Sequence, residues 1–178
     1  DLDYIDLLWL HAWDSTSPVE EVMRSFDDLV RQGKILYIGI SDAPAWIISQ
    51  ANTIAQLRGW TPFIGLQIEY SLIERTPERD LLPMAQAFDI GVTAWSPLGA
   101  GVLTGKYNKP EPAEGRLSNP ETSRPVTERQ LAIAQTVLEV AAEIGKSPAQ
   151  VALNWLRQQQ TPVIPIIGSR KLTQLQDN

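Results

Sequence analysis

A strand-length apolar segment recurs about every 30 residues, and this rhythm constrains the fold of the chain more than any other feature. Segments of this kind begin at Tyr4, Ile35, Phe63 and Val92, and another begins at Val163 after a longer interval. An interval of about 30 residues accommodates one strand and one helix of a βαβ unit. Strands that alternate with helices form a parallel sheet or barrel, so we expect an α/β fold.

Helical periodicity fills the gaps between these segments. The first helix should follow Ser17 and Pro18, with Ser17 and Glu20 forming a capping box, and it should end near Gly33. Further helices are expected over residues 47–55, from Thr76 through residue 88, from Thr127 to Gly145 and from Ser147 through Trp155.

The chain has 178 residues, 43% of them hydrophobic, which suffices for one core, so we expect a single domain over residues 1–178. Residues Tyr107–Val126 are rich in proline and polar side chains and are expected to form a surface loop.

Composition excludes several kinds of site. The chain lacks cysteine and has one histidine, His11, which excludes disulfides, cysteine nucleophiles and metal sites with cysteine or several histidine ligands. The net charge of -6 argues against a nucleic-acid or membrane partner. The sequence shows neither a leader nor an apolar run of the roughly 20 residues that a membrane span needs. We therefore expect a cytoplasmic protein without a metal site.

Polar and small residues gather at the carboxyl ends of the expected strands. In a parallel barrel these ends share one face, where active sites lie. Helix capping is the alternative for some of them, notably Asp42 and Ser169. The residues are His11, Ser41, Asp42, Gln67, Glu69, Tyr70, Trp95, Ser96, Gly168, Ser169 and Arg170. Together they predict a functional site on the face of the barrel where the strands end.

The glycine-rich segment at residues 96–106 is neither a Walker A loop nor a G-x-G-x-x-G fingerprint. We expect the backbone N–H groups of Gly99, Gly101 and Gly105 to face an anion, with Lys106 adding charge. A flexible turn is the alternative interpretation.

A second anion-friendly segment, residues 168–178, begins a helix, and Arg170 and Lys171 add positive charge near its start. Phosphate sites of barrels often follow the last two strands, which is where both anion-friendly segments occur.

Five motifs occur in one order along the chain: Tyr4–His11, Gly39–Asp42, Gln67–Ser71, Trp95–Leu98 with Leu103–Lys106, and Ile167–Arg170. In order and spacing they resemble the aldo-keto reductases, most closely the bacterial aryl-alcohol-dehydrogenase-like branch, over essentially all 178 residues. The resemblance implies a (β/α)₈ TIM-barrel fold, present here as about strands 4–8. It also implies reduction of a small aldehyde or ketone to an alcohol with NADP(H), or with NAD(H) as the alternative.

The resemblance assigns a role to individual residues. His11 matches the histidine that orients the carbonyl, and Trp95 matches the aromatic residue that stacks on the nicotinamide ring. Ser41, Asp42 and Gln67 match the positions around the carboxamide, although the family usually has asparagine at Asp42, and a carboxylate only accepts hydrogen bonds. The pyrophosphate loop corresponds to Ser96, Pro97, Leu98, Gly101 and Lys106, and the adenosine end to Gly168, Ser169, Arg170, Gln174 and Asn178.

Arg170 is the candidate for binding a 2′-phosphate, whereas Gln174 stands where many members have arginine. The resemblance places the family's catalytic aspartate, tyrosine and lysine before the first strand. We therefore expect an N-terminally truncated domain that is weak or inactive alone. The strands near Tyr4 and Val163 would have open edges, so we expect either a homo-oligomer that pairs through these edges or a chain that is a piece of a longer polypeptide.

Two other functions compete with carbonyl reduction. A non-catalytic module that binds or senses NADP(H) would need the cofactor site without the proton donor. A barrel glycosidase would use Glu69 with a second carboxylate, but no other glutamate lies at a strand end.

Overall fold

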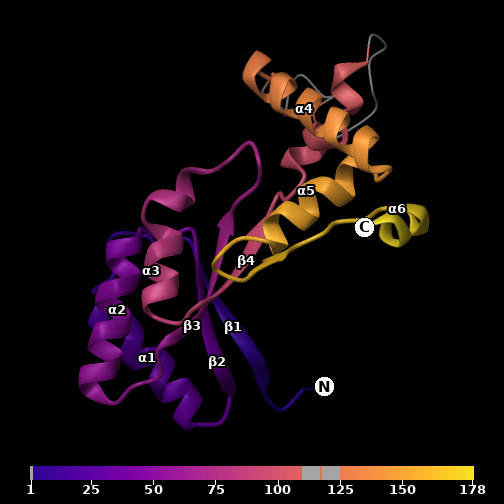
Figure 1. The fold of residues 1–178 in the computed structure, drawn as a ribbon. Helices are drawn as coiled ribbons and strands as arrows, with labels where there is room; N and C mark the ends of the chain where they lie inside the picture. Colours follow the sequence, from indigo (N-terminus) through magenta and orange to yellow (C-terminus); the bar gives the residue numbers. More distant parts are fainter. Residues whose placement is uncertain (1, 110–116, 118–124) are drawn as a thin grey trace. The chain divides into compact units, whose positions relative to one another are not determined.

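The computed structural model describes residues 2–109, 117 and 125–178 (Figure 1). Five strands form one sheet in the order β1-β2-β3-β4-β5, and β1–β2 and β2–β3 pair in parallel. The strands are β1 (Ile5–His11), β2 (Ile35–Ser41), β3 (Phe63–Glu69), β4 (Gly91–Trp95) and β5 (Val163–Pro165). In the described residues the sheet is open, with β1 and β5 outermost, so the predicted α/β fold of the partial-barrel type is confirmed.

Helices separate the strands as the periodicity predicts. They are α1 (Val19–Arg31), α2 (Ala45–Arg58), α3 (Leu81–Ala87), α4 (Glu128–Ile144), α5 (Pro148–Arg157) and α6 (Leu172–Asp177), with 3₁₀ turns at η1 (Thr76–Arg79), η2 (Gly99–Thr104) and η3 (Lys106–Asn108). The helix expected from Thr76 is therefore a 3₁₀ turn followed by α3, because the Asp80 side chain caps a new start at Leu81. Within the described residues no helix is both long and apolar enough for a membrane crossing.

The chain divides into two compact units, which are considered separately below. Unit 1 comprises Asp1–Ile68 and Pro77–Thr93, and unit 2 comprises Glu69–Thr76 and Ala94–Asn178. The single domain expected from the sequence stays a prediction. The expected loop Tyr107–Val126 lies mostly outside the described residues.

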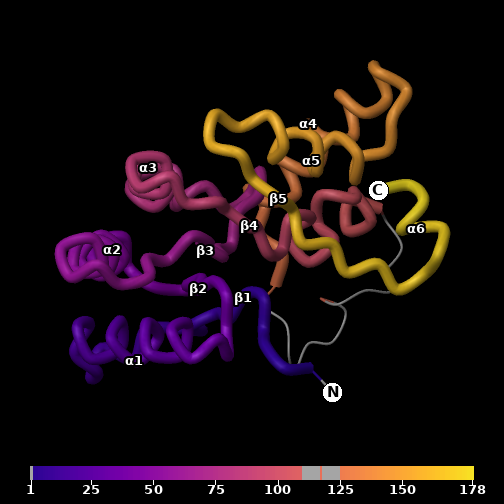
Figure 2. Tube along the Cα trace, turned by 90° about the horizontal axis from the view of Figure 1, so that it is seen from below, coloured from indigo at the N-terminus to yellow at the C-terminus, as the bar shows by residue number. Residues whose placement is uncertain are grey.

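In unit 1, helices α1, α2 and α3 lie on one face of the sheet (Figures 1 and 2). The apolar side chains between these layers are almost fully buried, and they include Met23, Ile38, Ile40, Ile48, Phe63, Leu66 and Val92. Asn52 of α2 is 4% exposed and clamps the start of β3, because its side chain accepts from the N–H of Phe63 at 2.9 Å and donates to its carbonyl at 3.0 Å.

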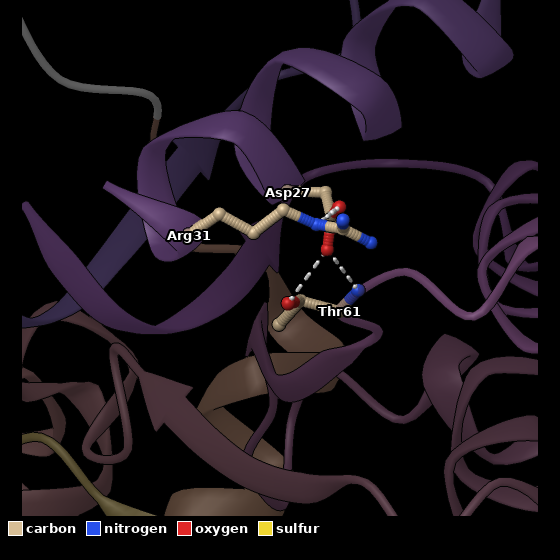
Figure 3. Close-up of polar contacts among 3 residues, drawn as sticks. All are labelled: Asp27, Arg31 and Thr61. Atoms are coloured by element: carbon tan, nitrogen blue, oxygen red, sulfur yellow. Dashed lines mark hydrogen bonds and ion pairs between the residues drawn. The ribbon is translucent and has the colours of Figure 1, made fainter. Parts of the chain in front are cut away.

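A buried carboxylate ties α1 to the turn that leads into β3 (Figure 3). Asp27 is 4% exposed and accepts hydrogen bonds from the Thr61 N–H at 2.9 Å, the Thr61 hydroxyl at 3.1 Å and the Arg31 Nε at 2.5 Å. Burial raises the pKa of Asp27, but the hydrogen bonds from Thr61 and Arg31 outweigh it and hold the pKa below its usual 3.8.

The start of α1 corrects one expectation. Ser17 does not cap the helix, because its hydroxyl donates to the Asp14 carboxylate at 2.9 Å, and Pro18 occupies the N-cap position. Glu20, the expected partner in the capping box, instead pairs with Arg58 of α2 at 2.8 Å.

The opposite face of the strands in unit 1 carries an indole ring over two glycines. Trp9, Gly39 and Gly65 are register partners on β1, β2 and β3. A Cβ atom at Gly39 would lie 2.5 Å from Trp9 Cε3, and one at Gly65 would lie 2.8 Å from Trp9 Cη2. The ring therefore fills the space that any larger residue at either position would need.

In unit 2, α4 and α5 both begin at the capping boxes predicted from the sequence. Thr127 with Gln130 caps α4, and Ser147 with Gln150 caps α5. The helices and η2 enclose a small apolar cluster built on Leu103, Val137 and Ala152, with Ile73 and Leu98 among the side chains packed against it.

Candidate functional site

Three of the predicted site residues lie side by side at the carboxyl ends of the strands in unit 1. His11 ends β1 opposite Ser41, and Ser41 ends β2 opposite Gln67 of β3. The parallel register therefore aligns an imidazole, a hydroxyl and an amide in one row, as the strand boundaries predicted.

Ser41 is the most informative member of this row. It is 2% exposed, and its hydroxyl has no hydrogen-bond partner among the described residues. Most buried polar groups in folded proteins have a partner, so an orphaned hydroxyl of this kind fits a ligand that completes the bond. A carboxamide both donates and accepts, and it therefore suits a hydroxyl beside the Gln67 amide.

His11 and Asp42 remain accessible beside this row. His11 Nε2 lies 3.9 Å from Asp42 Oδ2, and their side chains are 78% and 38% exposed. A contact this long between exposed side chains contributes little to stability, so both side chains can contact a ligand. No three metal-ligating side chains come together in the part of the chain that the structure describes.

The residue directly after each of three strands has a left-handed backbone. Ala12 follows β1 with φ 57°, Asp42 follows β2 with φ 49° and Ser96 follows β4 with φ 52°. Each such residue other than glycine costs roughly 1–2 kcal/mol, and such strain concentrates at functional sites. The sequence pattern did not single out Ala12, because alanine carries no signal for this conformation.

In unit 2, the glycine-rich segment corrects the prediction that its glycine N–H groups face an anion. The N–H of Gly99 donates to the Ser96 carbonyl at 2.8 Å, that of Gly101 to Leu98 at 3.0 Å and that of Gly105 to Val102 at 2.9 Å. These turns use the N–H groups of all three glycines within the chain, so these donors do not face an anion.

Lys106 adds a positive charge to this segment. A Cβ atom at Gly101, whose φ is 93°, would lie 2.8 Å from Lys106 Cε and 3.0 Å from its Nζ. The lysine side chain therefore folds over the bare Gly101 backbone, and its Nζ lies 4.9 Å from the centre of the Tyr107 ring. This arrangement places the Lys106 ammonium group over the glycine-rich loop. Directly before that loop, the sequence has Trp95, Ser96, Pro97 and Leu98.

The segment after β5 neighbours the end of β4, because the Ile166 N–H donates to the Ala94 carbonyl at 2.8 Å. The helix expected to begin at Gly168 begins later, and its binding of a phosphate stays a prediction. The N–H groups of Arg170 and Lys171 donate to Gln174 Oε1 at 3.0 and 3.2 Å, and α6 begins only at Leu172. Gln174 thus caps this turn, while the side chain of Arg170 stays exposed.

The C-terminal segment also borders a cavity of about 240 Å³ in unit 2. Asn178, whose amide donates to the Ser169 hydroxyl at 3.3 Å, lines the cavity together with Asn154 and Arg157 of α5. Gly168 precedes this segment as a surface residue. The cavity is thus lined by amide and guanidinium groups together with the apolar side chains of Leu153, Pro165 and Ile167.

The predicted site residues thus divide between the two units. His11, Ser41 and Gln67 lie in one row within unit 1, whereas Trp95, Lys106 and Arg170 belong to unit 2. Their convergence on one ligand stays a prediction.

Comparison with known proteins identifies the relatives of this chain. The model of the family described as "Aldo/keto reductase family" matches residues 1–178. A probable aryl-alcohol dehydrogenase of Saccharomyces cerevisiae is 37% identical over 183 residues, covering 99% of this chain and 54% of the relative. An aryl-alcohol dehydrogenase [NADP(+)] of Phanerodontia chrysosporium is 38% identical over 184 residues, covering 98% and 47%. A norsolorinic acid reductase of Aspergillus flavus is 36% identical over 176 residues, covering 99% and 44%. The chain spans about half the length of these curated relatives.

Proposed function

Because the chain belongs to the aldo/keto reductase family, we propose that it supplies the cofactor-binding half of an NADP(H)-dependent reductase of aldehydes or ketones. The observation that carries the proposal is the row of His11, Ser41 and Gln67, with the orphaned hydroxyl of Ser41 at its centre. A relative named for its use of NADP(+) supports this choice of cofactor.

The nicotinamide cofactor, when bound, supplies the hydride for carbonyl reduction. Ser41 and Gln67 would hold its carboxamide, since a hydroxyl and an amide offer both donors and acceptors at the level where β2 and β3 end. Asp42 would accept one further hydrogen bond, and Trp95 would stack on the ring. In this proposal the strained backbone after the strands keeps these side chains at the rim.

His11 would orient the substrate carbonyl, and its 78% exposure leaves the imidazole able to reach it. Reduction puts negative charge on the carbonyl oxygen, which must be met by a proton or an electrophile in the transition state. A single imidazole can orient and polarise the substrate carbonyl. According to the resemblance, the tyrosine that donates the proton lies outside these residues. We therefore expect the 178 residues alone to bind the cofactor but to be weak or inactive in carbonyl reduction.

Lys106, held over the bare backbone of Gly101, would neutralise the pyrophosphate, with Ser96, Pro97 and Leu98 forming the rest of the loop. Arg170, exposed beside the turn that Gln174 caps, would pair with the 2′-phosphate. The cavity that Asn178 lines would accept the adenosine end.

Titration of NADPH against the chain, followed by tryptophan fluorescence, tests the proposal. We expect saturable quenching, weaker binding of NADH, and an Arg170→Ala variant that no longer prefers NADPH. In the longest protein that contains these residues, His11→Ala should lower kcat at least ten-fold while changing the NADPH Kd less than two-fold, because general acid–base and orienting groups contribute about 10²–10⁴-fold to rate. Absence of quenching would refute the proposal, whereas binding of NADPH by that longest protein without any turnover of carbonyls would favour an NADP(H)-binding module.

A further inference from the structure

The segment that follows β3 forms a hydrogen-bonded turn that belongs to unit 2. The Ser71 N–H donates to the Glu74 carbonyl at 3.0 Å, and the Glu74 N–H donates back to the Ser71 carbonyl at 3.2 Å. The Ser71 hydroxyl also accepts from the N–H groups of Ile73 and Glu74, at 3.3 and 3.2 Å. Ser71 is 1% exposed, so this turn keeps its shape through hydrogen bonds shielded from water.

Tyr70, at the start of this turn, is fully buried and joins β4 to the end of α5. Its N–H donates to the Trp95 carbonyl at 3.4 Å, and its hydroxyl donates to Gln159 Oε1 at 3.2 Å. Gln159 is itself held, because its Nε2 donates to the Trp155 carbonyl at 2.8 Å. The Trp155 ring packs on the Tyr70 ring with the centres 5.3 Å apart.

The Trp155 ring makes a second contact with the segment that contains Tyr70. The guanidinium carbon of Arg75 lies 5.4 Å from the centre of the Trp155 ring, and Arg75 belongs to the same short segment as Tyr70. The segment that contains Tyr70 and Arg75 therefore contacts Trp155 of α5 through both of these side chains.

The position of Trp95 depends on contacts of this kind. It is the last residue of β4, it is only half-buried, and the next residue, Ser96, turns the chain away with a φ of 52°. The hydrogen bond from the Tyr70 N–H at 3.4 Å is long, so its strength depends on where the Tyr70 backbone is held.

We propose that Tyr70, locked by Gln159 and Trp155, is a positioning residue that sets the orientation of Trp95 against the nicotinamide ring. The inference rests on the proposed function, because it assumes that Trp95 stacks on a bound dinucleotide. Tyr70 acts through Trp95, since its own side chain is fully buried. The contact concerns the nicotinamide half of the cofactor, whereas Arg170 and the cavity serve the adenosine half.

The test compares two ligands across matched variants of the chain. Tyr70→Phe removes the hydroxyl but keeps the ring packing, and Gln159→Leu removes the acceptor at the other end of the same bond. Tyr37→Phe is the control, because this tyrosine of β2 is 53% exposed. The ligands are NADPH and adenosine 2′,5′-bisphosphate, which lacks the nicotinamide, and urea unfolding verifies that each variant is folded.

We expect Tyr70→Phe and Gln159→Leu each to weaken NADPH binding about three- to ten-fold, the range that one lost hydrogen bond supports. Binding of adenosine 2′,5′-bisphosphate should change less than two-fold, and Tyr37→Phe should alter neither ligand. The double variant should be no worse than Gln159→Leu alone, because both changes break the Tyr70–Gln159 hydrogen bond and only Gln159→Leu also removes the bond to the Trp155 carbonyl.

Unchanged NADPH binding in folded Tyr70→Phe would overturn the inference, as would an equal loss for both ligands, which signals general loosening of unit 2. These results leave the proposed function intact, since wild-type binding would persist. A wild-type chain that binds no NADPH would overturn both.

Discussion

Replacing Asp27 with asparagine removes a buried negative charge from unit 1 while keeping the size and shape of the side chain. In the native protein one carboxylate oxygen accepts two hydrogen bonds from Thr61, and the other accepts one from Arg31. An asparagine can keep the two Thr61 contacts as neutral hydrogen bonds. Its amide nitrogen would face the Arg31 donor, so Arg31 would turn towards water.

The magnitude follows from the strength of these bonds. Hydrogen bonds to a charged acceptor contribute about 1.5–3 kcal/mol and neutral ones about 0.5–1.5 kcal/mol, so each Thr61 contact should lose about 1 kcal/mol. The pair with Arg31, which is 64% exposed, adds only about 0.3–0.5 kcal/mol, as is usual for pairs one helical turn apart. We therefore expect Asp27→Asn to lower the free energy of unfolding by about 2–3 kcal/mol at neutral pH.

The loss should also depend on pH. Hydrogen bonds hold the pKa of Asp27 below its usual 3.8 against the opposing effect of burial. A carboxylate with a depressed pKa stabilises the folded state above its unfolded pKa, and this contribution disappears as the pH falls through the folded pKa. The difference in unfolding free energy between wild type and Asp27→Asn should therefore be constant near neutrality and shrink below about pH 4.

Urea unfolding of the chain at several pH values, followed by tryptophan emission, measures both effects. Asp28→Asn is the matched control, because it changes the same charge on the exposed side of α1 and should shift stability by less than about 0.5 kcal/mol. Hydrogen exchange of the Thr61 amide reports on the contact itself and should accelerate only in Asp27→Asn. Equal stabilities for the two variants, or unaltered exchange at Thr61, would refute this reasoning.

Two further predictions concern the packing of unit 1. Asn52→Leu should cost about 2–4 kcal/mol in urea unfolding, because it leaves the N–H and carbonyl of Phe63 buried without partners, and a loss no larger than that of the exposed Gln56→Leu would contradict the clamp. Gly39→Ala should cost about 1–3 kcal/mol, because the new methyl group must displace the Trp9 ring, and the tryptophan emission should shift to longer wavelength. An unshifted spectrum together with native stability would show that the ring does not fill that space.

The fold was predictable because its signals are local and repeated. Each strand begins within a residue of the position expected from its apolar run, and α4 and α5 start at Thr127 and Ser147 because a capping box needs only two residues three apart. The row of His11, Ser41 and Gln67 follows from the strand ends, since parallel strands end at a common edge.

The errors arose where a nearby group outcompeted the expected one. Asp14 captures the Ser17 hydroxyl, and Gln174 caps the turn at which the last helix was expected to begin. Both competitors are ordinary residues whose orientation depends on the local turn, and the pattern of residue types does not encode it. Tyr70 was placed near the functional site, but its partner Gln159 lies 89 residues further along the chain, beyond the reach of any local pattern.

The indole of Trp9 over Gly39 and Gly65 also restricts which substitutions this sheet can accept during evolution. While the indole is present, a side chain added at either glycine meets an occupied space, so single replacements there should be selected against. Once position 9 has become smaller, both glycines can vary. We therefore expect that, in related sequences, Trp9 is replaced by a smaller residue before Gly39 or Gly65 is replaced by a larger one.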